Sequence, residues 1–392
     1  MKKILLSGFI ACSIFGQAQS FIQAYANRAN DVQQTNINTL LQEFGNLGIK
    51  RTGTTANTNA LNWIKNKYTG YGYQASQMEE QSFSYTQGGN TVTSKNLIVT
   101  KTGTTYPNIY VIVCGHFDSV TGPGVNDNGS GTSSILEAAR ILRNVPTEYS
   151  IKFIHFSGEE QGLYGSYAYV NNIVNATTPK MAIKVVFNLD QVGGKATNNN
   201  TTIYCDVDQS NPVSNNAASQ DMATQLATCT ALYSPLQTAY DPAYSTDYVP
   251  FMLNGDVVTG FYEYTRSYTE HTVNDTYANV DKTYVFNVAK AGVGAIQHFA
   301  IAQTVLGTDE NYTTNEDLTI SPNPTAENLR LDLPKDVKGT FVFEATDMSG
   351  KLVLTSKNKK EINISNLPNG MYMGTVKVKD GKYFKKKFIV KK

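Results

Sequence analysis

The sequence is poor in cysteine and histidine, with four of each among its 392 residues. Only Cys114, Cys205 and Cys229 follow the first eighteen residues, and none is close to another in the sequence. An odd number without short spacing excludes a zinc finger and a disulfide scaffold. A bridge between Cys205 and Cys229 remains open, whereas Cys114 lies in an apolar run where we expect a buried thiol.

A long apolar run and a basic stripe are also missing. Downstream of the N-terminus no stretch is apolar for long enough to span a membrane. Residues 313–392 carry 15 Lys and Arg against 9 Asp and Glu, whereas residues 1–312 carry 18 against 23. The acidic main part argues against a nucleic-acid partner. The asymmetry indicates two different modules.

The first eighteen residues have the features of an export signal. They begin with two lysines, continue with a short apolar stretch and end with the small-x-small triplet Gly16, Gln17 and Ala18. This pattern is typical of a secretory signal peptide cleaved near Ala18. A lipoprotein signal that uses Cys12 is the alternative, which the residues before it disfavour. We expect a protein that is secreted, either into the medium or to the cell surface.

The middle of the chain has an α/β pattern. Residues 21–70 show helical apolar spacing, and residues 77–101 alternate around Gly88 and Gly89 as a hairpin does. Short continuous apolar runs then alternate with helical patterns. The runs are IYVIVC (109–114), IKFIHF (151–156), AIKVVFNL (182–189) and VVTGFY (257–262), and helices are expected at 131–143 and 284–304. This alternation predicts a mixed, mostly parallel central sheet flanked by helices, in one domain over residues 19–306.

The end of the chain has a different pattern. Residues 307–316 are polar and are predicted to form a linker. Short alternating segments separated by turn residues follow over 317–392. They predict a small all-β sandwich.

Histidine and carboxylate side chains follow the expected strands. In open α/β sheets ligands bind beyond the carboxyl ends of the strands, so these side chains are expected at one rim. Three strands are followed in turn by His116 with Asp118, by Glu159 with Glu160, and by Asp190, and two loops carry Asp127 and His271.

Three ionised carboxylates at one rim would repel each other strongly in a cleft of low dielectric. Asp127, Glu160 and Asp190 together with one hydroxide carry four negative charges, which two divalent ions would balance. Imidazole and carboxylate ligands around an open position are typical of hydrolytic zinc, and two zinc ions that share a carboxylate lie about 3.5–4 Å apart.

Five ordered motifs carry a family resemblance: GHFDS, GVNDNGSG, FSGEEQGLYGS, NLDQVG and EHTVNDT. Together they resemble the co-catalytic zinc aminopeptidase family, which includes secreted bacterial leucyl-type aminopeptidases and, more distantly, glutamate carboxypeptidases. The resemblance covers roughly residues 35–305. It implies a zinc-dependent metallo-aminopeptidase that acts on peptides with a free N-terminus.

The resemblance also implies a role for each motif residue. Asp127 would bridge two Zn²⁺ ions, Glu160 and His271 would complete one ion, and His116 and Asp190 the other. Glu159 would act as general base and acid on a hydroxide that bridges the ions, and Asp118 would orient His116. The peptide bond after Asp127 is expected to be cis, as in relatives.

The sequence departs from some relatives at one position. A tyrosine that stabilises the tetrahedral intermediate precedes the last histidine there, whereas this chain has Glu270. Tyr268 or another tyrosine is a candidate, and the donor stays unassigned. Residues predicted to line the side-chain pocket are Tyr248, Phe251 and Tyr262. We expect His155 and His298 to be structural, and Asp275 and Asp281 to cap or brace the loop after His271.

The last eighty residues resemble a second family. The segments LTISPNPTAENLRL, DMSGKLV, INISNLPNGMYMGTVKV and KKFIVKK are similar to the C-terminal sorting domain of type IX secretion. The implied partner is the type IX secretion machinery. A carbohydrate- or surface-binding sandwich is the alternative.

Two other functions compete with a peptidase. A glutaminyl-cyclase-like zinc acyltransferase would keep the fold, but such relatives lack the complete two-ion ligand set. A catalytically inert secreted binding or adhesion protein would be expected to have lost Glu159 or a ligand. Metal content discriminates among the three: two ions, one or none per chain.

Overall fold

The computed structural model describes residues 19–304, 318–333, 339–347, 352–378 and 383–392. The chain divides into two compact units: the first extends to Gln303 except for Ile22–Ala24, and these three residues are grouped with Thr304–Lys392 in the second. The predicted signal peptide (1–18) and linker (307–316) lie outside the described residues.

The first unit is built on one eight-stranded sheet with the order β1-β2-β4-β3-β5-β8-β6-β7. The pairs β4–β3, β3–β5, β5–β8 and β6–β7 are parallel, and β1–β2, β2–β4 and β8–β6 are antiparallel. The prediction of a mixed, mostly parallel central sheet is confirmed. The strands are β1 (Met78–Gln87), β2 (Asn90–Lys101), β3 (Tyr106–His116), β4 (Tyr149–Phe156), β5 (Ala182–Leu189), β6 (Thr202–Val207), β7 (Gln237–Pro242) and β8 (Val258–Glu263).

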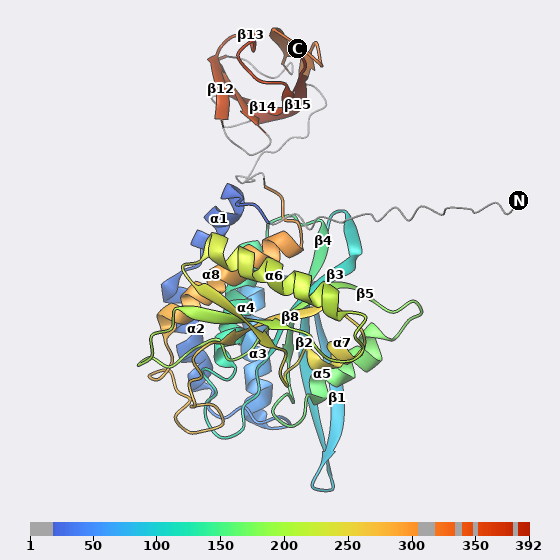
Figure 1. Ribbon diagram of the computed structural model, residues 1–392, viewed down its shortest axis with the longest axis vertical. Helices are drawn as coiled ribbons and strands as arrows, with labels where there is room; N and C mark the ends of the chain where they lie inside the picture. Colours follow the sequence, from blue (N-terminus) through green and yellow to red (C-terminus); the bar gives the residue numbers. More distant parts are fainter. Residues whose placement is uncertain (1–18, 305–317, 334–338, 348–351, 379–382) are drawn as a thin grey trace, which may run out of the picture. The chain divides into compact units, whose positions relative to one another are not determined.

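Helices cover both faces of this sheet (Figure 1). On one face Phe153 of the sheet packs near Tyr68, and Phe187 packs against Phe299, at ring separations of 6.3 and 5.9 Å. On the other face Tyr169 and Phe251 belong to a second apolar cluster. The helices are α1 (Gln23–Asn30), α2 (Gln34–Asn46), α3 (Thr55–Gly70), α4 (Gly129–Leu142), α5 (Tyr164–Tyr169), α6 (Asn216–Tyr233), α7 (Val249–Leu253) and α8 (Lys282–Phe299), with short turns η1 (Ala75–Gln77) and η2 (Val170–Val174).

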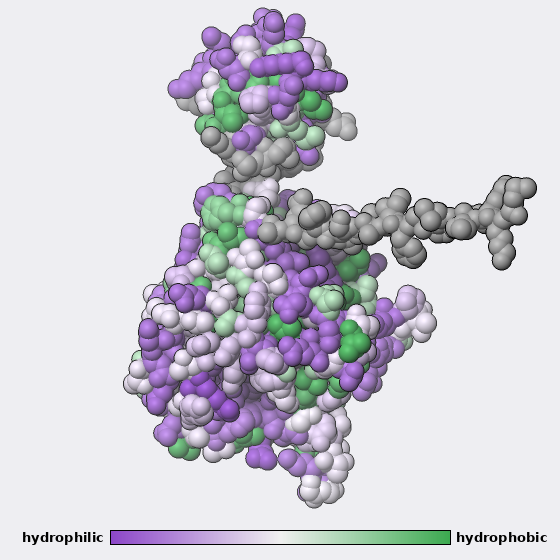
Figure 2. Space-filling view, viewed as in Figure 1, coloured by the Kyte–Doolittle hydropathy of each residue, from purple (hydrophilic) through white to green (hydrophobic). Residues whose placement is uncertain are grey.

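The core strands are apolar along their length because helices cover both of their sides. In β4 every residue after Tyr149 is buried. On the face shown in Figure 2 apolar residues of the first unit appear in small areas among hydrophilic ones. Among the described residues, no helix combines the length and apolar character needed to cross a membrane.

The start of α4 explains how the glycine- and asparagine-rich loop is fixed. Asn128 is the N-cap of this helix, and its side chain accepts a hydrogen bond from the Gly131 amide at 3.0 Å. The same side chain donates to the Leu189 carbonyl at the end of β5, at 2.8 Å. Asparagine is a favoured N-cap residue because its oxygen satisfies an unpaired amide of the first turn. The cap therefore holds Asp127 next to the end of β5.

The second unit has only antiparallel pairing among its described strands, so the predicted all-β C-terminal part is confirmed. A three-stranded sheet (β13-β10-β9) and a four-stranded sheet (β12-β11-β14-β15) share one apolar core. The strands are β9 (Thr319–Ser321), β10 (Asn328–Asp332), β11 (Phe341–Asp347), β12 (Leu352–Lys357), β13 (Glu361–Asn363), β14 (Gly370–Val378) and β15 (Tyr383–Val390).

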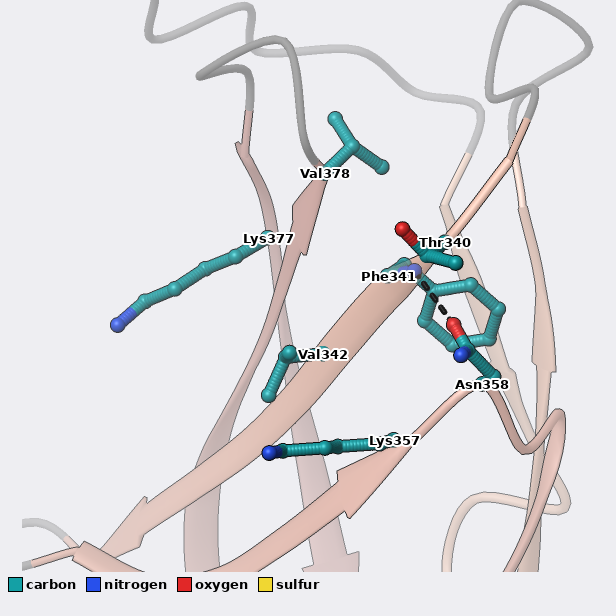
Figure 3. A pocket seen from close by; sticks show the side chains of 7 residues that line it. All are labelled: Thr340, Phe341, Val342, Lys357, Asn358, Lys377 and Val378. Atoms are coloured by element: carbon teal, nitrogen blue, oxygen red, sulfur yellow. Dashed lines mark hydrogen bonds between the residues drawn. The ribbon is translucent and has the colours of Figure 1, made fainter.

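A hollow of about 350 Å³ lies at one end of the four-stranded sheet (Figure 3). At its wall the Asn358 side chain accepts a hydrogen bond from the Phe341 amide at 2.7 Å. Lys377 is one of its lining residues and forms an ion pair with Glu344 at 2.7 Å. The hollow therefore combines the apolar side chains of Phe341, Val342 and Val378 with polar and charged ones.

The three described cysteines are all buried and free in the structure. The bridge that the sequence left open between Cys205 and Cys229 is therefore not formed. Burial raises the pKa of both thiols, which disfavours the reactive thiolate.

His155 is structural, as predicted, and its burial makes the stability of the first unit depend on pH. Its ring nitrogen Nε2 lies 2.9 Å from the Tyr68 hydroxyl, and burial lowers its pKa to about 3. The unfolded chain takes up a proton below about pH 6.5, whereas the folded chain does so only near pH 3. Stability from this group is therefore present above pH 6.5 and is lost as the pH falls toward 3.

We predict that His155→Gln, which keeps an acceptor for Tyr68, reduces this acid sensitivity. As the pH falls from 6.5 to 4, the unfolding free energy of the variant should gain on that of the wild type by up to about 1.4 kcal/mol per pH unit. Urea unfolding followed by the fluorescence of Trp63, the only tryptophan, measures the difference. Parallel pH profiles for the two proteins would contradict the prediction.

Candidate metal centre

Three adjacent parallel strands deliver the predicted side chains to one edge of the sheet. The order β4-β3-β5 places β3 between the other two strands. His116 is the last residue of β3, and Asp190 directly follows β5. Glu159 and Glu160 lie three and four residues beyond the end of β4. Because the carboxyl ends of parallel strands meet at one edge, residues far apart in sequence converge there.

Two groups of ligand-type side chains share Asp127. In one group His116 Nε2 lies 3.1 Å from Asp127 Oδ1 and 3.3 Å from Asp190 Oδ1. In the other His271 Nε2 lies 3.2 Å from Asp127 Oδ2 and 2.9 Å from Glu160 Oε2. The ligand atoms of each group lie within 4.8 Å of one another. The two oxygens of Asp127 thus face different groups.

Burial opposes the ionisation of the two glutamates at the site, whereas hydrogen bonds from two imidazoles favour the ionised form of Asp127. Burial and the charge of Asp127 raise the pKa of Glu160 to about 8. Burial raises the pKa of Glu159 far above its ordinary value, and the charge of Asp190 adds to the effect. For Asp127 burial acts in the same direction, but hydrogen bonds from His116 and His271 outweigh it and lower the pKa.

The same charges act on the histidines. The hydrogen bond to Asp127 raises the pKa of His271 to about 9, with a further contribution from Glu160. Carboxylate oxygens and imidazole nitrogens at these separations fit a zinc ion. The charge of zinc would keep the carboxylates ionised and the imidazoles neutral.

Further side chains fix these ligands. Asp275 accepts hydrogen bonds from the amides of Asn126 and Asp127 at 2.6 and 2.9 Å, so it ties the loop after His271, in which it lies, to the loop that carries Asp127. The Thr246 hydroxyl donates to Asp190 Oδ2 at 2.5 Å, a contact that the sequence did not reveal. Asp281 is the N-cap of α8, and the expected cis peptide bond follows Asp127.

Asp118 contacts His116 through a different atom from the expected one. Nδ1 of His116 lies 3.2 Å from the backbone carbonyl oxygen of Asp118 and 3.7 Å from its carboxylate. The closer carbonyl oxygen takes the imidazole N–H. The carboxylate of Asp118 instead accepts hydrogen bonds from the amides of Glu159 and Glu160, each at 3.3 Å.

Glu159 lies beside the first group without belonging to either group. Its Oε2 is 3.9 Å from His116 Nε2, and its side chain is 13% exposed. Among the described residues the two ligand groups comprise only His116, Asp127, Glu160, Asp190 and His271. The Glu159 carboxylate is therefore free to act on a molecule bound at the site.

The residues predicted to line the side-chain pocket do not all lie at an exposed surface. Tyr248 and Phe251 have no exposed surface and belong to the apolar cluster on one face of the sheet, so they are core residues and do not line a pocket. The Tyr248 hydroxyl donates to Asp206 at 3.2 Å. Tyr262 is half-buried, and its ring lies 4.6 Å from that of Tyr244. Of the three predicted pocket residues, Tyr248 and Phe251 therefore belong to the core.

The tyrosines and Glu270 near the site have distinct environments. Glu270 forms an ion pair with Arg266 at 2.6 Å, and Tyr268 is 77% exposed. The Tyr244 hydroxyl donates to the backbone oxygen of Asp190 at 3.2 Å, a neighbour of the site that the sequence did not single out. The expectation that His298 is structural agrees with its contact to the Tyr233 hydroxyl at 2.8 Å.

Comparison with known families identifies both units. Residues 96–294, just over half of the chain, match Peptidase family M28, the family of co-catalytic zinc aminopeptidases. The chain belongs to Peptidase family M28. Residues 319–391 match the secretion system C-terminal sorting domain, which points to secretion or the cell surface. Both resemblances noted in the sequence are confirmed.

Curated relatives share a short segment with this chain. Aminopeptidase YwaD of Bacillus subtilis is 46% identical over 104 residues, 26% of this chain and 22% of the relative. An aminopeptidase of Pseudomonas aeruginosa is 41% identical over 97 residues, 24% of this chain and 18% of the relative. The chain thus spans about a fifth of the length of these curated relatives.

Solved structures share the fold at low identity. LapA aminopeptidase of Legionella pneumophila has a TM-score of 0.61 at 20% identity, covering 76% of this chain and 80% of its own. The aminopeptidase of Aneurinibacillus sp. strain AM-1 has a TM-score of 0.61 at 17% identity, and the match covers 74% of this chain and 98% of that one. The glutaminyl cyclase of Macrostomum lignano has a TM-score of 0.63 at 14% identity, and the match covers 76% of this chain and 100% of that one. The fold is therefore common to two kinds of enzyme, and the site must separate them.

The shared carboxylate gives a direct prediction for metal binding. We expect Asp127→Ala to lose all tightly bound zinc, because both groups lose a ligand. His116→Ala and His271→Ala should each weaken mainly one ion. Zinc analysis of the dialysed protein measures this, with Asp332→Ala in the second unit as control. Full zinc retention by Asp127→Ala would rule out a shared role.

Proposed function

We propose that this protein is a secreted metallo-aminopeptidase that holds two Zn²⁺ ions and removes residues from peptides with a free N-terminus. The observation that carries the proposal is the position of Asp127, whose two oxygens face two complete ligand groups. His116 and Asp190 would hold one ion, and Glu160 and His271 the other. Membership of Peptidase family M28 supports the same reading.

The residues divide the work of hydrolysis. Zinc at such a site supplies a Lewis acid for the scissile carbonyl and lowers the pKa of water. Glu159 takes the proton from the attacking water and delivers it to the leaving amine. Its position outside both ligand groups leaves its carboxylate available for this transfer. Because it adds a negative charge beside a balanced centre, the site suits an ammonium group.

The alternative of a glutaminyl-cyclase-like acyltransferase has the support of the shared fold. The complete group of His116, Asp127 and Asp190 beside the second group favours a two-ion hydrolase. An inert binding protein has no need of a free Glu159 next to an intact ligand set. We therefore place hydrolysis first.

The first prediction from this proposal concerns Glu159 as the general base. Glu159→Gln should keep normal zinc content and lower kcat by at least ~10²-fold, the scale of general acid–base assistance. Steady-state kinetics on a leucyl peptide and zinc analysis of the same sample test it, with exposed Glu79→Gln as the matched control. Near-normal turnover by the zinc-loaded variant would remove Glu159 from this role.

The second prediction concerns the substrate end. A leucyl peptide should be cleaved and its N-acetylated form rejected, because acetylation removes the charge of the amine and adds bulk beside the metals. The measurement compares kcat/KM for the two peptides. Comparable values would indicate an endopeptidase or carboxypeptidase with the same metal centre.

For the second unit we propose recognition by the type IX secretion machinery. The match of residues 319–391 to a sorting domain supports this role. A carbohydrate- or surface-binding sandwich remains the competing reading of the same β structure. Removal of the second unit distinguishes these two functions, because only a sorting domain is required for secretion.

The third prediction from this proposal concerns removal of the second unit. A variant that ends at residue 310 keeps every proposed ligand and Glu159, so it should have full peptidase activity. In the native host it should remain in the periplasm. Activity assays and fractionation of cells and medium measure both effects, and secretion at the normal level would contradict the sorting role.

A further inference from the structure

Residues 50–57, which we call the 50–57 segment, precede the part of the chain that matches the peptidase family. Lys50, Thr52 and Asn57 of this segment are all buried, with at most 5% of each residue exposed. Their side chains contact the two loops that carry the ligands after β3 and β4. The sequence alone did not single out any of the three.

The carboxylate of Asp118 is the point where the segment meets the site. It has no exposed surface and accepts hydrogen bonds from the amides of Glu159 and Glu160, each at 3.3 Å. Its third donor is the Thr52 hydroxyl, at 3.2 Å from Oδ2. Because both amides belong to the turn that carries the two glutamates, this one carboxylate sets the position of the proposed base and of a proposed ligand.

A buried hydrogen-bond network lies behind Thr52. The Thr52 and Ser157 hydroxyl oxygens are 3.3 Å apart, and Asn57 Nδ2 donates to Ser157 Oγ at 3.1 Å. Ser94 in turn donates to Asn57 Oδ1 at 2.7 Å. The Ser157 hydroxyl has two acceptors within reach, Thr52 Oγ1 and Asn57 Oδ1, each at 3.3 Å, while the Thr52 hydroxyl donates to Asp118. A network of this kind polarises its members.

Lys50 fixes the other end of the segment. Its Nζ donates to the carbonyl oxygens of Gly48, at 2.8 Å, and Pro123. Its backbone amide donates to the Ser119 hydroxyl at 3.0 Å. Pro123 and Ser119 lie on the loop between His116 and Asp127. The segment is therefore tied to both ligand-bearing loops.

We propose that Thr52 is a positioning residue of the metal centre, acting through Asp118 on the backbone of Glu159 and Glu160. The proposal rests on the proposed function in assigning Glu159 and Glu160 their roles. Reacting groups must be held to within a fraction of an ångström, and partners that orient metal ligands typically contribute 10- to 100-fold in metal affinity or activity. Thr52→Val, which keeps the shape and removes the hydroxyl, isolates this contribution.

The test compares full-length Thr52→Val, Thr52→Ser and Thr58→Val. Thr58 is exposed on α3 and bonds only to the Thr54 carbonyl oxygen at 3.4 Å, so it controls for the substitution itself. For Thr52→Val we expect kcat on a leucyl peptide to fall about tenfold with KM changed less than about twofold. Thr52→Ser should retain kcat within about twofold, because it restores the hydroxyl, and Thr58→Val should match the wild type.

A second readout is independent of turnover. Competition with a chelator should show that Thr52→Val holds its more weakly bound zinc about tenfold less tightly than Thr52→Ser. If the wild type cleaves no peptide, the proposed function fails, and the zinc comparison alone decides the role of Thr52. Equal kcat and equal zinc affinity for Thr52→Val and wild type would overturn the proposal. So would equal losses for the Val and Ser variants, since the hydroxyl would then not be responsible.

Discussion

Negative charge gathered at one buried edge of a sheet is the constraint on which this structure depends. Asp127, Glu160 and Asp190 converge with Glu159 where water is largely excluded, and burial raises the pKa of both glutamates. Such a cluster is costly unless positive charge compensates it. His116 and His271 both lie against Asp127, and the neighbouring carboxylates raise the pKa of each imidazole. Divalent cations held by these residues would meet that demand and would supply the Lewis acid for hydrolysis.

The surrounding fold holds the charged groups against their repulsion. The strand order β4-β3-β5 brings three ligand-bearing ends together. Asn128 caps α4 and ties the Asp127 loop to the end of β5, while Asp275 holds two amides of that loop. Asp118 holds the two amides of the glutamate turn. These contacts tie the loops that carry the candidate ligands to one another and to the end of β5.

Much of the fold and the ligand set could be predicted from the sequence because the signals are local. Continuous apolar runs predicted the central strands, and candidate ligands lie at or shortly after the ends of three of them. The segment over β6, α6 and β7 gave no comparable signal, since β6 mixes polar and apolar residues and α6 is not clearly amphipathic. Tyr248 and Phe251 were misplaced because aromatic residues near a site resemble pocket residues and core residues alike. Thr52 and Thr246 escaped notice because a hydroxyl contact across long sequence separations leaves no pattern in the chain.

The most direct test of the account is a crystal structure of the zinc-loaded protein with anomalous data collected at the zinc edge. The account predicts two anomalous peaks per chain, about 3.5–4 Å apart, one beside each oxygen of Asp127. One peak should have His116 and Asp190 as its other ligands, and the second Glu160 and His271. A single peak, or two peaks that do not share Asp127, would contradict it.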